Sequence, residues 1–289
     1  MIGEALRARV EHELGRRVTR SARVSGGDIN EAFELALSDG ASVFLKTNDR
    51  APPEMFAAEA RGLGFLAEAR ALRIPNVLGF SGASERPSFL LLEFIRAAEP
   101  RKHFDEELGR GLAALHRASA PSFGFEASNF IGRLPQSNRA HETWAEFYRA
   151  ERLEPQLALA LKSGQAEVSL ARDFERLFQL LPELVGESEP PARLHGDLWG
   201  GNLHTDEHGA PCLIDPAVYG GHREVDLAMM QLFGGFSTRV FSAYAEAFPP
   251  APGQRERVPL YQLYPLLVHL NLFGAGYVAS VKRALGAYL

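Results

Sequence analysis

The sequence has almost no cysteine, with Cys212 as its single thiol among 289 residues. One thiol cannot form an internal disulfide, so a disulfide-stapled scaffold is excluded. The stretch from Met1 to Leu14 alternates charged and apolar residues and lacks the apolar core of a signal peptide. Both observations favour the cytoplasm. Cys212 lies in the apolar run 211–214, where we expect a small buried side chain.

The sequence also lacks an excess of positive charge and a long uninterrupted hydrophobic run. It has 31 basic and 36 acidic side chains and a net charge of −5, so no general field attracts a polyanion, and nucleic acid is not an expected partner. The most apolar stretch, from Leu260 to Val281, contains Gln262, His269 and Asn271, which are costly in hydrocarbon. We expect a buried helix there and no membrane partner.

The composition does not indicate long disorder, because 46% of the residues are hydrophobic and 23% are charged. The sequence shows no internal repeat. The length allows two lobes, each with its own core. Alternating apolar residues predict an α+β protein, with a first lobe over residues 1–95 and a mostly helical second lobe over 96–289. The first lobe is expected to hold a helix and a five-stranded antiparallel sheet. The predicted strands are Val18–Val24, Ala32–Leu37, Ser42–Lys46, Val77–Phe80 and Ser88–Ile95.

The most informative polar segment is Arg193–Asn202, followed by a second carboxylate at Asp215. It places Asp197, Asn202 and Asp215 around one tight loop between two short apolar strands. In kinases one Asp accepts the proton of the attacking hydroxyl, while an Asn and another Asp hold magnesium. Turn formation also uses Asp, Asn and Gly, but it does not explain why Asp215 directly follows a strand. The pattern therefore indicates phosphoryl transfer.

A glycine-bearing turn lies between the first two predicted strands. Paired glycines let backbone N–H groups approach phosphates closely, although a plain hairpin turn explains this segment as well. The candidate phosphate loop consists of Gly26, Gly27, Asp28, Ile29 and Asn30.

Two charged residues further along the chain fit the same chemistry. Lys46 ends the third predicted strand, and Glu59 lies in the middle of the helix predicted over 53–70. Kinase sites use a strand lysine to hold the α- and β-phosphates and a helix glutamate to fix that lysine. Glu54 competes for this role, but Glu59 lies mid-helix, where its direction is better fixed.

The segment Glu93-Phe94-Ile95 ends the last predicted strand where the two lobes are expected to join. Its backbone is the candidate binder of adenine; the alternative is a simple edge strand. Asp226, at the start of a helix after Asp215, is expected to cap or brace the loop that contains Asp197.

With these residues identified, the sequence resembles the fructosamine kinase (ketosamine 3-kinase) family, within a protein-kinase-like group that includes aminoglycoside and choline kinases. The resemblance covers nearly the whole chain, and several segments carry it in the right order. They are Gly26–Glu31, Phe123–Phe125, Pro135–Asn138, His195–Asn202, Gly234–Ser237 and Phe273–Tyr277.

The resemblance implies a bilobal protein-kinase-like fold, with residues 1–95 as the nucleotide-binding lobe and residues 96–289 as the catalytic and substrate lobe. It also implies ATP-dependent phosphorylation of the 3-hydroxyl of a ketosamine, free or on a protein lysine, to an unstable 3-phosphate whose elimination frees the amine. By matching positions, Asp197 becomes the base, Asn202 and Asp215 the Mg²⁺ ligands, and Lys46 with Glu59 the phosphate-positioning pair. Candidate substrate residues are Trp199, His195, Gln136, Phe236 and His269.

The sequence leaves alternatives for the role of Trp199 and for the function. Trp199 either forms a wall of the acceptor site or packs the loop onto the second lobe. An aminoglycoside or choline-type kinase of the same fold is the first rival function, although an aminoglycoside site should be strongly acidic and no dense acidic run follows Arg193. A pseudokinase acting as an interaction module is the second, although every catalytic position is filled. A monomer is slightly favoured.

Overall fold

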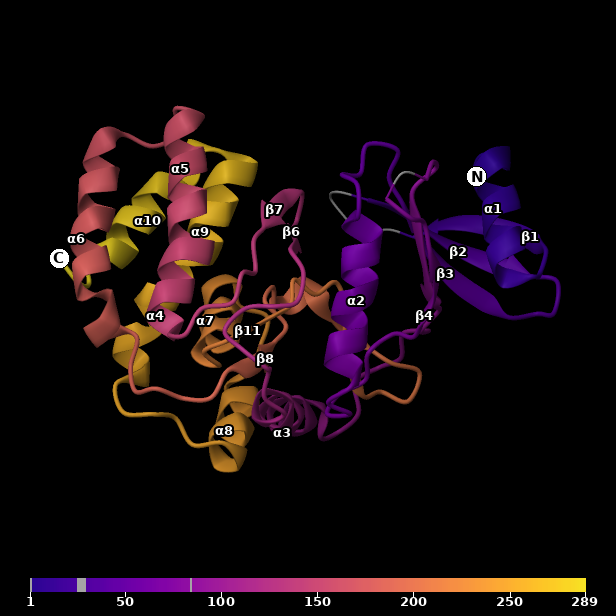
Figure 1. Cartoon of the computed structure of the whole chain (residues 1–289). Coiled ribbons are helices and arrows are strands. Elements are labelled where there is room, and N and C mark those ends of the chain that lie inside the picture. Colours follow the sequence, from indigo (N-terminus) through magenta and orange to yellow (C-terminus); the bar gives the residue numbers. More distant parts are fainter. Residues whose placement is uncertain (1, 25–29, 84) are drawn as a thin grey trace. The chain divides into compact units, whose positions relative to one another are not determined.

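The computed structural model describes residues 2–24, 30–83 and 85–289 (Figure 1). The chain forms two compact units, each described by itself below. The first contains residues 1–104 and 203–216, and the second contains residues 105–202 and 217–289. These units differ from the predicted domains in two places, because the first continues beyond residue 95 and also includes the later segment 203–216.

The first unit is built on a five-stranded antiparallel sheet, as predicted. Its strand order is β1-β2-β3-β5-β4. The strands are β1 (Val18–Val24), β2 (Glu31–Leu37), β3 (Ser42–Thr47), β4 (Val77–Phe80) and β5 (Phe89–Glu93). The unit also contains helices α1 (Glu4–Leu14) and α2 (Met55–Ala67), and the hairpin of β9 (Leu203–Thr205) and β10 (Pro211–Leu213).

Successive side chains of a strand point to opposite faces of the sheet, and each face packs against a different helix. Leu45 of β3 is fully buried in one cluster with Leu6 and Val10 of α1. The next residue, Lys46, points to the other face, where its ammonium contacts Glu59 of α2. The helices α1 and α2 therefore cover opposite faces of the sheet (Figure 1).

The second unit is mostly helical. Its helices are α3 (Phe104–Arg117), α4 (Trp144–Phe147), α5 (Glu154–Lys162), α6 (Val168–Leu184), α7 (Glu224–Phe233), α8 (Thr238–Ala247), α9 (Gln254–Phe273) and α10 (Val278–Leu285). A π-helix, η1 (Tyr148–Leu153), joins α4 to α5, and 3₁₀ turns η2 (Gly200–Asn202) and η3 (Ala275–Tyr277) follow. The short strands β6 (Asn129–Ile131) and β7 (Leu134–Gln136) pair with each other, as do β8 (Ala192–Leu194) and β11 (Tyr219–Gly221).

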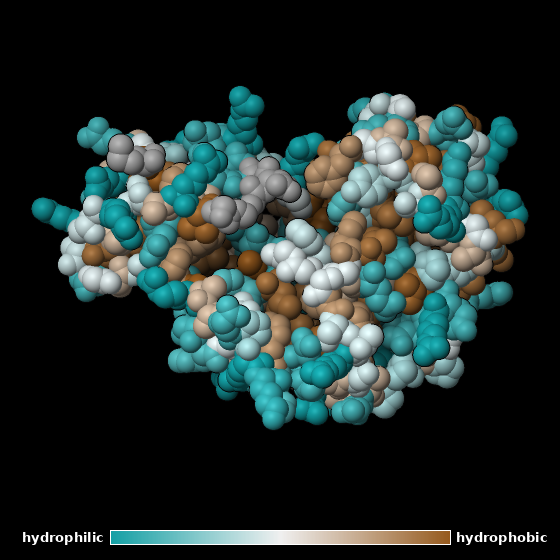
Figure 2. All heavy atoms as spheres, turned by 180° about the vertical axis from the view of Figure 1, so that it is seen from behind, coloured by the Kyte–Doolittle hydropathy of each residue, from teal (hydrophilic) through white to brown (hydrophobic). Residues whose placement is uncertain are grey.

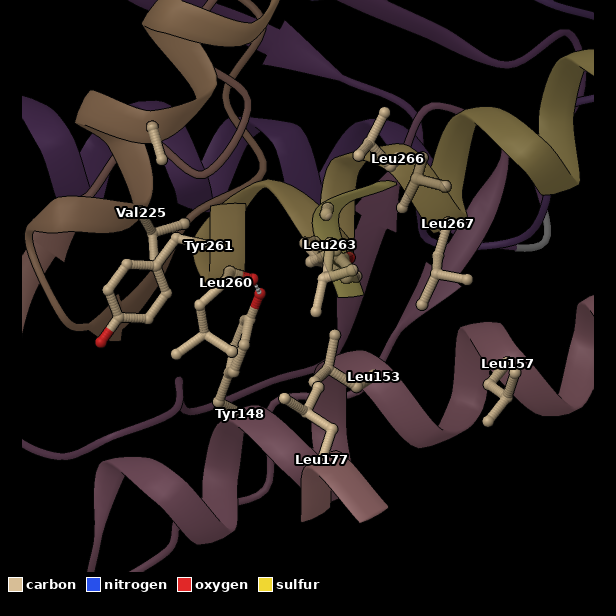
Figure 3. Packing of buried hydrophobic residues seen from close by; sticks show 14 of the residues in the cluster. Tyr148, Leu153, Leu157, Leu177, Val225, Leu260, Tyr261, Leu263, Leu266 and Leu267 are labelled. Atoms are coloured by element: carbon tan, nitrogen blue, oxygen red, sulfur yellow. Dashed lines mark hydrogen bonds between the residues drawn. The ribbon is translucent and has the colours of Figure 1, made fainter. Parts of the chain in front are cut away.

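The core of the second unit forms around α9. Figure 3 shows Leu260, Leu263 and Leu267 of this helix lying near Tyr148 and Leu153 of the π-helix. These five side chains are fully buried. Replacing any one of the three leucines with alanine would lower the free energy of unfolding by roughly 2–5 kcal/mol.

The predicted helix over 260–281 is not continuous. The helix α9 ends at Phe273, because Gly274 takes φ +102°, a conformation that ends a helix and that residues with a Cβ rarely adopt. The turn η3 and helix α10 follow.

No helix in the described part of the chain is long and apolar enough to cross a bilayer. Polar and hydrophobic residues are interspersed on the face shown in Figure 2.

A buried histidine in this unit gives its stability a dependence on pH. His222, between β11 and α7, is 3% exposed, and its ring stacks on Tyr261 at 5.4 Å between centroids. Burial lowers the pKa of His222 to about 4, and the positive charges of Arg257 and Arg223 act in the same direction, opposed by Glu189. His222 is therefore neutral at pH 7.

We expect the free energy of unfolding to fall in acid because of His222. The unfolded chain takes up this proton near pH 6.5 and the folded chain only near pH 4. The contribution is thus fully present above pH 6.5 and decreases as the pH falls towards 4, by about 3 kcal/mol. Urea unfolding of the parent and His222→Gln at pH 7 and pH 4.5 measures it. The variant should lose less stability between these pH values; equal losses would contradict the assignment.

Candidate functional site

In the first unit, the ammonium of Lys46 lies between two carboxylates. Its Nζ is 2.7 Å from Glu59 Oε1 on α2 and 2.5 Å from Asp215 Oδ1, just after β10. The structure thus brings together the lysine and the helix glutamate that the sequence paired. The competing candidate, Glu54, lies instead 3.5 Å from Arg61. The contact with Asp215 is an addition that the sequence did not indicate.

This ion cluster fixes a positive charge inside the unit. Burial alone would lower the pKa of Lys46, but the charges of Asp215 and Glu59 outweigh it and raise the pKa above its ordinary value. Burial raises the pKa of the Glu59 carboxyl, against the effect of Lys46. Lys46 therefore stays protonated at neutral pH, which an anion-binding lysine requires.

Asp215 differs from its two partners in exposure and backbone conformation. Its side chain is 41% exposed, against 8% for Lys46 and 14% for Glu59. Its φ of +55° is left-handed, a conformation that Asp tolerates better than most residues. The carboxylate therefore projects from a sharp bend after a strand and can meet a ligand from solvent.

In the second unit, the loop that follows β8 contains Asp197, the predicted base. The side-chain amide of Asn202 donates to the carbonyl oxygen of Asp197 at 2.8 Å and to its Oδ2 at 3.2 Å. The structure thus brings these two predicted residues together. Because the amide nitrogen makes both contacts, the atom of Asn202 suited to a metal ion is its Oδ1.

Asp226 braces this loop, as predicted. Its buried carboxylate accepts hydrogen bonds from the backbone N–H groups of His195, at 2.8 Å, and Gly196, at 2.9 Å. Burial would raise the pKa of Asp226, but the contact with His116 and the charges and N–H groups around it lower the pKa overall. A permanent negative charge therefore holds the backbone just before Asp197.

Gly196 makes this backbone path possible. Its φ is +81°, and an added Cβ would lie 2.1 Å from the carbonyl oxygen of Ala217. The backbone N–H of Ala217 in turn donates to the carbonyl oxygen of His195 at 2.9 Å. The chain therefore needs glycine before Asp197, for steric and conformational reasons together.

Asp197 and Gly196 line a pocket of about 300 Å³, a volume that includes solvent at its mouth. Apart from Asp197 and His269, its lining is mainly apolar. The other lining residues are Ile131, Val225, Met229, Tyr264, Pro265 and Val268. The structure thus places His269, a predicted substrate residue, in the same pocket as the predicted base.

Gln136 was also predicted to meet substrate, but it is 2% exposed and its amide is bonded within the protein. Its Nε2 donates to Asn129 Oδ1 at 2.7 Å and to the Ala217 carbonyl at 3.1 Å. Its Oε1 accepts from the hydroxyl of Tyr264 at 2.5 Å. Gln136 therefore holds Tyr264, which lines the pocket, and Ala217, which bonds to the loop that contains Asp197.

Arg152 of the π-helix completes this buried network, although it was not among the predicted site residues. Its Nη2 donates to Asn138 Oδ1 at 2.6 Å, and its guanidinium lies over the Tyr219 ring at 3.8 Å. Asn138 in turn donates to Asn129 at 3.0 Å. The polar run 135–138 was a visible signal, but nothing in the sequence shows which arginine it would meet.

The other predicted substrate residues lie on or beside the loop. His195 is fully buried, and its Nδ1 accepts the backbone N–H of Asp197 at 3.3 Å, so it supports the loop from within. Phe236 is half-buried in the connection between α7 and α8. Just before it, an added Cβ on Gly235 would lie 3.2 Å from Gly200 Cα, so this connection touches the loop.

Trp199 is 42% exposed. Its ring lies over Gly201, where an added Cβ would meet the indole at 2.3 Å. A side chain that anchors the loop to the second lobe is expected to be buried. The exposure of Trp199 therefore favours the alternative in which the indole forms a wall of the acceptor site.

The predicted adenine segment has the following contacts. Both carboxylate oxygens of Glu93 accept hydrogen bonds from Asn76, at 2.8 and 3.0 Å. The carbonyl of Ile95 accepts from His204 Nε2 at 3.1 Å. Phe94 lies 5.5 Å from the guanidinium of Arg96. Adenine binding by this segment stays a prediction.

The predicted phosphate loop falls almost entirely outside the described residues, which do not include Gly26, Gly27, Asp28 and Ile29. Asn30 is described, and its Oδ1 accepts a hydrogen bond from Asn48 at 3.0 Å. The link to Asn48, just beyond β3, places Asn30 beside the strand that carries Lys46.

The family model described as fructosamine kinase matches residues 4–289. A protein of Enterococcus faecium assigned as a ketoamine kinase is 38% identical, over 91% of this chain and 92% of its own. The chloroplastic protein-ribulosamine 3-kinase of Arabidopsis thaliana is 37% identical, over 94% and 83%.

Two solved structures are also similar to this chain. A Thermobifida fusca protein assigned as a fructosamine-3-kinase superposes with a TM-score of 0.90 at 38% identity and 99% coverage of both chains. An aminoglycoside phosphotransferase solved with hygromycin B gives a TM-score of 0.65 at 18% identity, over 98% and 96%. This second likeness concerns the fold alone, and it confirms the predicted protein-kinase-like α+β fold.

Proposed function

Because this chain belongs to the fructosamine kinase family, we propose that it transfers the γ-phosphoryl group of ATP to the 3-hydroxyl of a ketosamine, either free or on a protein lysine. The observation that carries the proposal is the position of Asp197. Its carboxylate lines a mainly apolar pocket and is held by Asn202, while Asp226 fixes the backbone before it. Membership of a kinase family implies ATP as the phosphoryl donor.

Asp197 acts as the base in this proposal. A sugar hydroxyl is a poor nucleophile at neutral pH, and a carboxylate within hydrogen-bond reach orients it and accepts its proton late in the transfer. The hydroxyl oxygen bonds to the γ-phosphorus as the bond from that phosphorus to the ADP oxygen breaks. The proton remains on Asp197 until solvent removes it. The 3-phosphate then leaves C3 as inorganic phosphate by elimination, and water hydrolyses the remaining imine to the free amine and a 3-deoxy dicarbonyl sugar.

The nucleotide side uses the residues of the ion cluster. Lys46, kept charged and directed by Glu59, would hold the α- and β-phosphates. Asn202 and Asp215 offer the amide and carboxylate oxygens that Mg²⁺ prefers, and Mg²⁺ commonly takes one or two carboxylates together with substrate phosphates. When bound, the ion neutralises charge on the phosphates. The loop from Gly26 to Asn30 and the segment from Glu93 to Ile95 are proposed to hold the phosphates and the adenine.

The pocket argues against an aminoglycoside as the acceptor. Polycationic acceptors call for several negative charges, yet among the described residues that line the pocket Asp197 alone is acidic. We expect ATP- and magnesium-dependent release of ADP with a fructosamine, ribulosamine or erythrulosamine. Aminoglycosides and choline should give none. Turnover of an aminoglycoside in preference to all three ketosamines would refute the proposal.

Trp199 provides a test of the acceptor side. If its exposed indole forms a wall for the sugar, Trp199→Ala should raise KM for a ketosamine by about tenfold, since a packed aromatic face contributes roughly 1–1.5 kcal/mol. KM for ATP and the melting temperature should stay near the parent values, and Trp199→Phe should recover part of the loss. A variant that melts several degrees lower with an unchanged ketosamine KM would show that the ring anchors the loop.

A further inference from the structure

Four aromatic rings gather at the end of α9, beside the pocket that contains Asp197. We call Phe233, His269, Phe273 and Tyr277 the aromatic surface. The His269 ring lies at their centre, with centroid distances of 4.4 Å to Phe233, 5.2 Å to Phe273 and 5.3 Å to Tyr277. Phe273 is 58% exposed and Phe233 is 36% exposed, so two of these rings offer much of their area to solvent.

His269 connects the aromatic surface to the pocket. It lines the pocket together with Asp197, and its Nδ1 lies 2.8 Å from the carbonyl oxygen of Pro265. A carbonyl can only accept, so Nδ1 carries a proton and donates it. Burial lowers the pKa of His269, against a smaller opposing effect of that hydrogen bond. The neutral ring then has Nε2 as an acceptor.

We propose that the aromatic surface is a subsite for the amine-derived half of the ketosamine, and that it selects substrates whose amine carries an apolar or aromatic group. This inference rests on the proposed function. A ketosamine with its 3-hydroxyl at Asp197 must direct its nitrogen and the attached group out of the pocket. His269 belongs both to the pocket and to the aromatic surface, so it marks a continuous path from one to the other.

The chemistry of the aromatic surface fits this occupant. The nitrogen of a ketosamine bears hydrogen, and Nε2 of neutral His269 can accept a hydrogen bond from it. Beyond the nitrogen, Phe273 and Phe233 offer ring faces for stacking and apolar contact. The guanidinium of Arg133 donates to the carbonyl of Leu272 at 3.2 Å and places a positive charge at this helix end. A neutral apolar group is therefore favoured there over a second cation.

The test compares two ketosamines of the same sugar, one made from methylamine and one from an aromatic amine such as benzylamine. In the parent enzyme, kcat/KM should be higher for the aromatic substrate. Phe273→Ala should lower kcat/KM for that substrate by about tenfold and change the value for the methylamine ketosamine by less than about twofold. Phe273→Leu should retain part of the preference. Val168→Ala, which truncates another exposed apolar side chain, should change neither value.

Several outcomes would overturn the proposal. Equal losses for both ketosamines, or no loss for either, would show that the ring does not contact the amine substituent. An altered sedimentation coefficient of Phe273→Ala with unchanged kinetics would assign the aromatic surface to contact with a second copy of the chain. Normal turnover of both substrates without discrimination refutes the subsite alone. Absence of turnover in the parent enzyme refutes the proposed function and the subsite with it.

Discussion

Asp197→Asn is expected to lower kcat for a ketosamine by about 10²–10⁴-fold, because the asparagine amide cannot accept the proton of the attacking hydroxyl. The substitution keeps the size of the side chain, and the oxygen of the new amide can still accept the hydrogen bond from Asn202. KM for the ketosamine should therefore change little. Single-turnover measurement at saturating ATP reports the chemical step directly.

Two controls separate loss of the base from loss of the site. The affinity for ATP with magnesium should match that of the parent, since the base acts on the acceptor. The melting temperature should also be unchanged, because Asp226 still holds the loop backbone. An asparagine variant that keeps most of its turnover would remove Asp197 from the role of base.

Asp215→Ala is expected to weaken ATP binding by at least about tenfold in the presence of magnesium and to change it little in EDTA. Even residues that only support a metal ligand contribute about 10–100-fold to metal affinity or activity, and a ligand itself should contribute no less. Lys46 also contacts Asp215 in this structure, but it keeps Glu59 as a partner at 2.7 Å. The lysine should thus remain charged and in place in the variant.

Glu59→Gln is the matched control for that experiment. It removes the other carboxylate beside Lys46 and leaves Asp215 unchanged. Any effect that reaches ATP through the lysine should then appear equally with magnesium and with EDTA. Titration of both variants with ATP under the two conditions gives four affinities. If Asp215→Ala weakened binding equally with and without magnesium, as expected for Glu59→Gln, Asp215 would be a partner of Lys46 and not a ligand of the ion.

Local sequence patterns predicted much of the fold and part of the site. The alternation of apolar residues around Lys46 gave its strand, and the mid-helix position of Glu59 gave its partner, because both signals depend on residues close in sequence. Asp226 was identified for the same reason, from its place at the start of a helix just after the motif. The five antiparallel strands follow from equally local alternation.

Contacts between distant segments could not be predicted in this way. Gln136 looked like a substrate residue because it is polar and lies in a segment that resembles the family, yet its bonds to Tyr264 and Ala217 bury it. Arg152 lies on the π-helix η1 and meets Asn138, which is 14 positions earlier in the chain. The grouping of Phe233 with His269 likewise joins two helices, α7 and α9. Hydrophobic periodicity cannot predict such contacts, because the residues that make them lie far apart in the sequence.

The most direct test of the proposed reaction is phosphorus NMR of the enzyme with ATP, magnesium and a ketosamine labelled with carbon-13 at C3. We expect one new phosphate monoester signal, coupled to the labelled carbon and formed in step with ADP, followed by inorganic phosphate and free amine as the product eliminates. A phosphate signal that lacks coupling to the labelled C3, or ADP formation with an unmodified ketosamine, would contradict the proposal that this chain is a ketosamine 3-kinase.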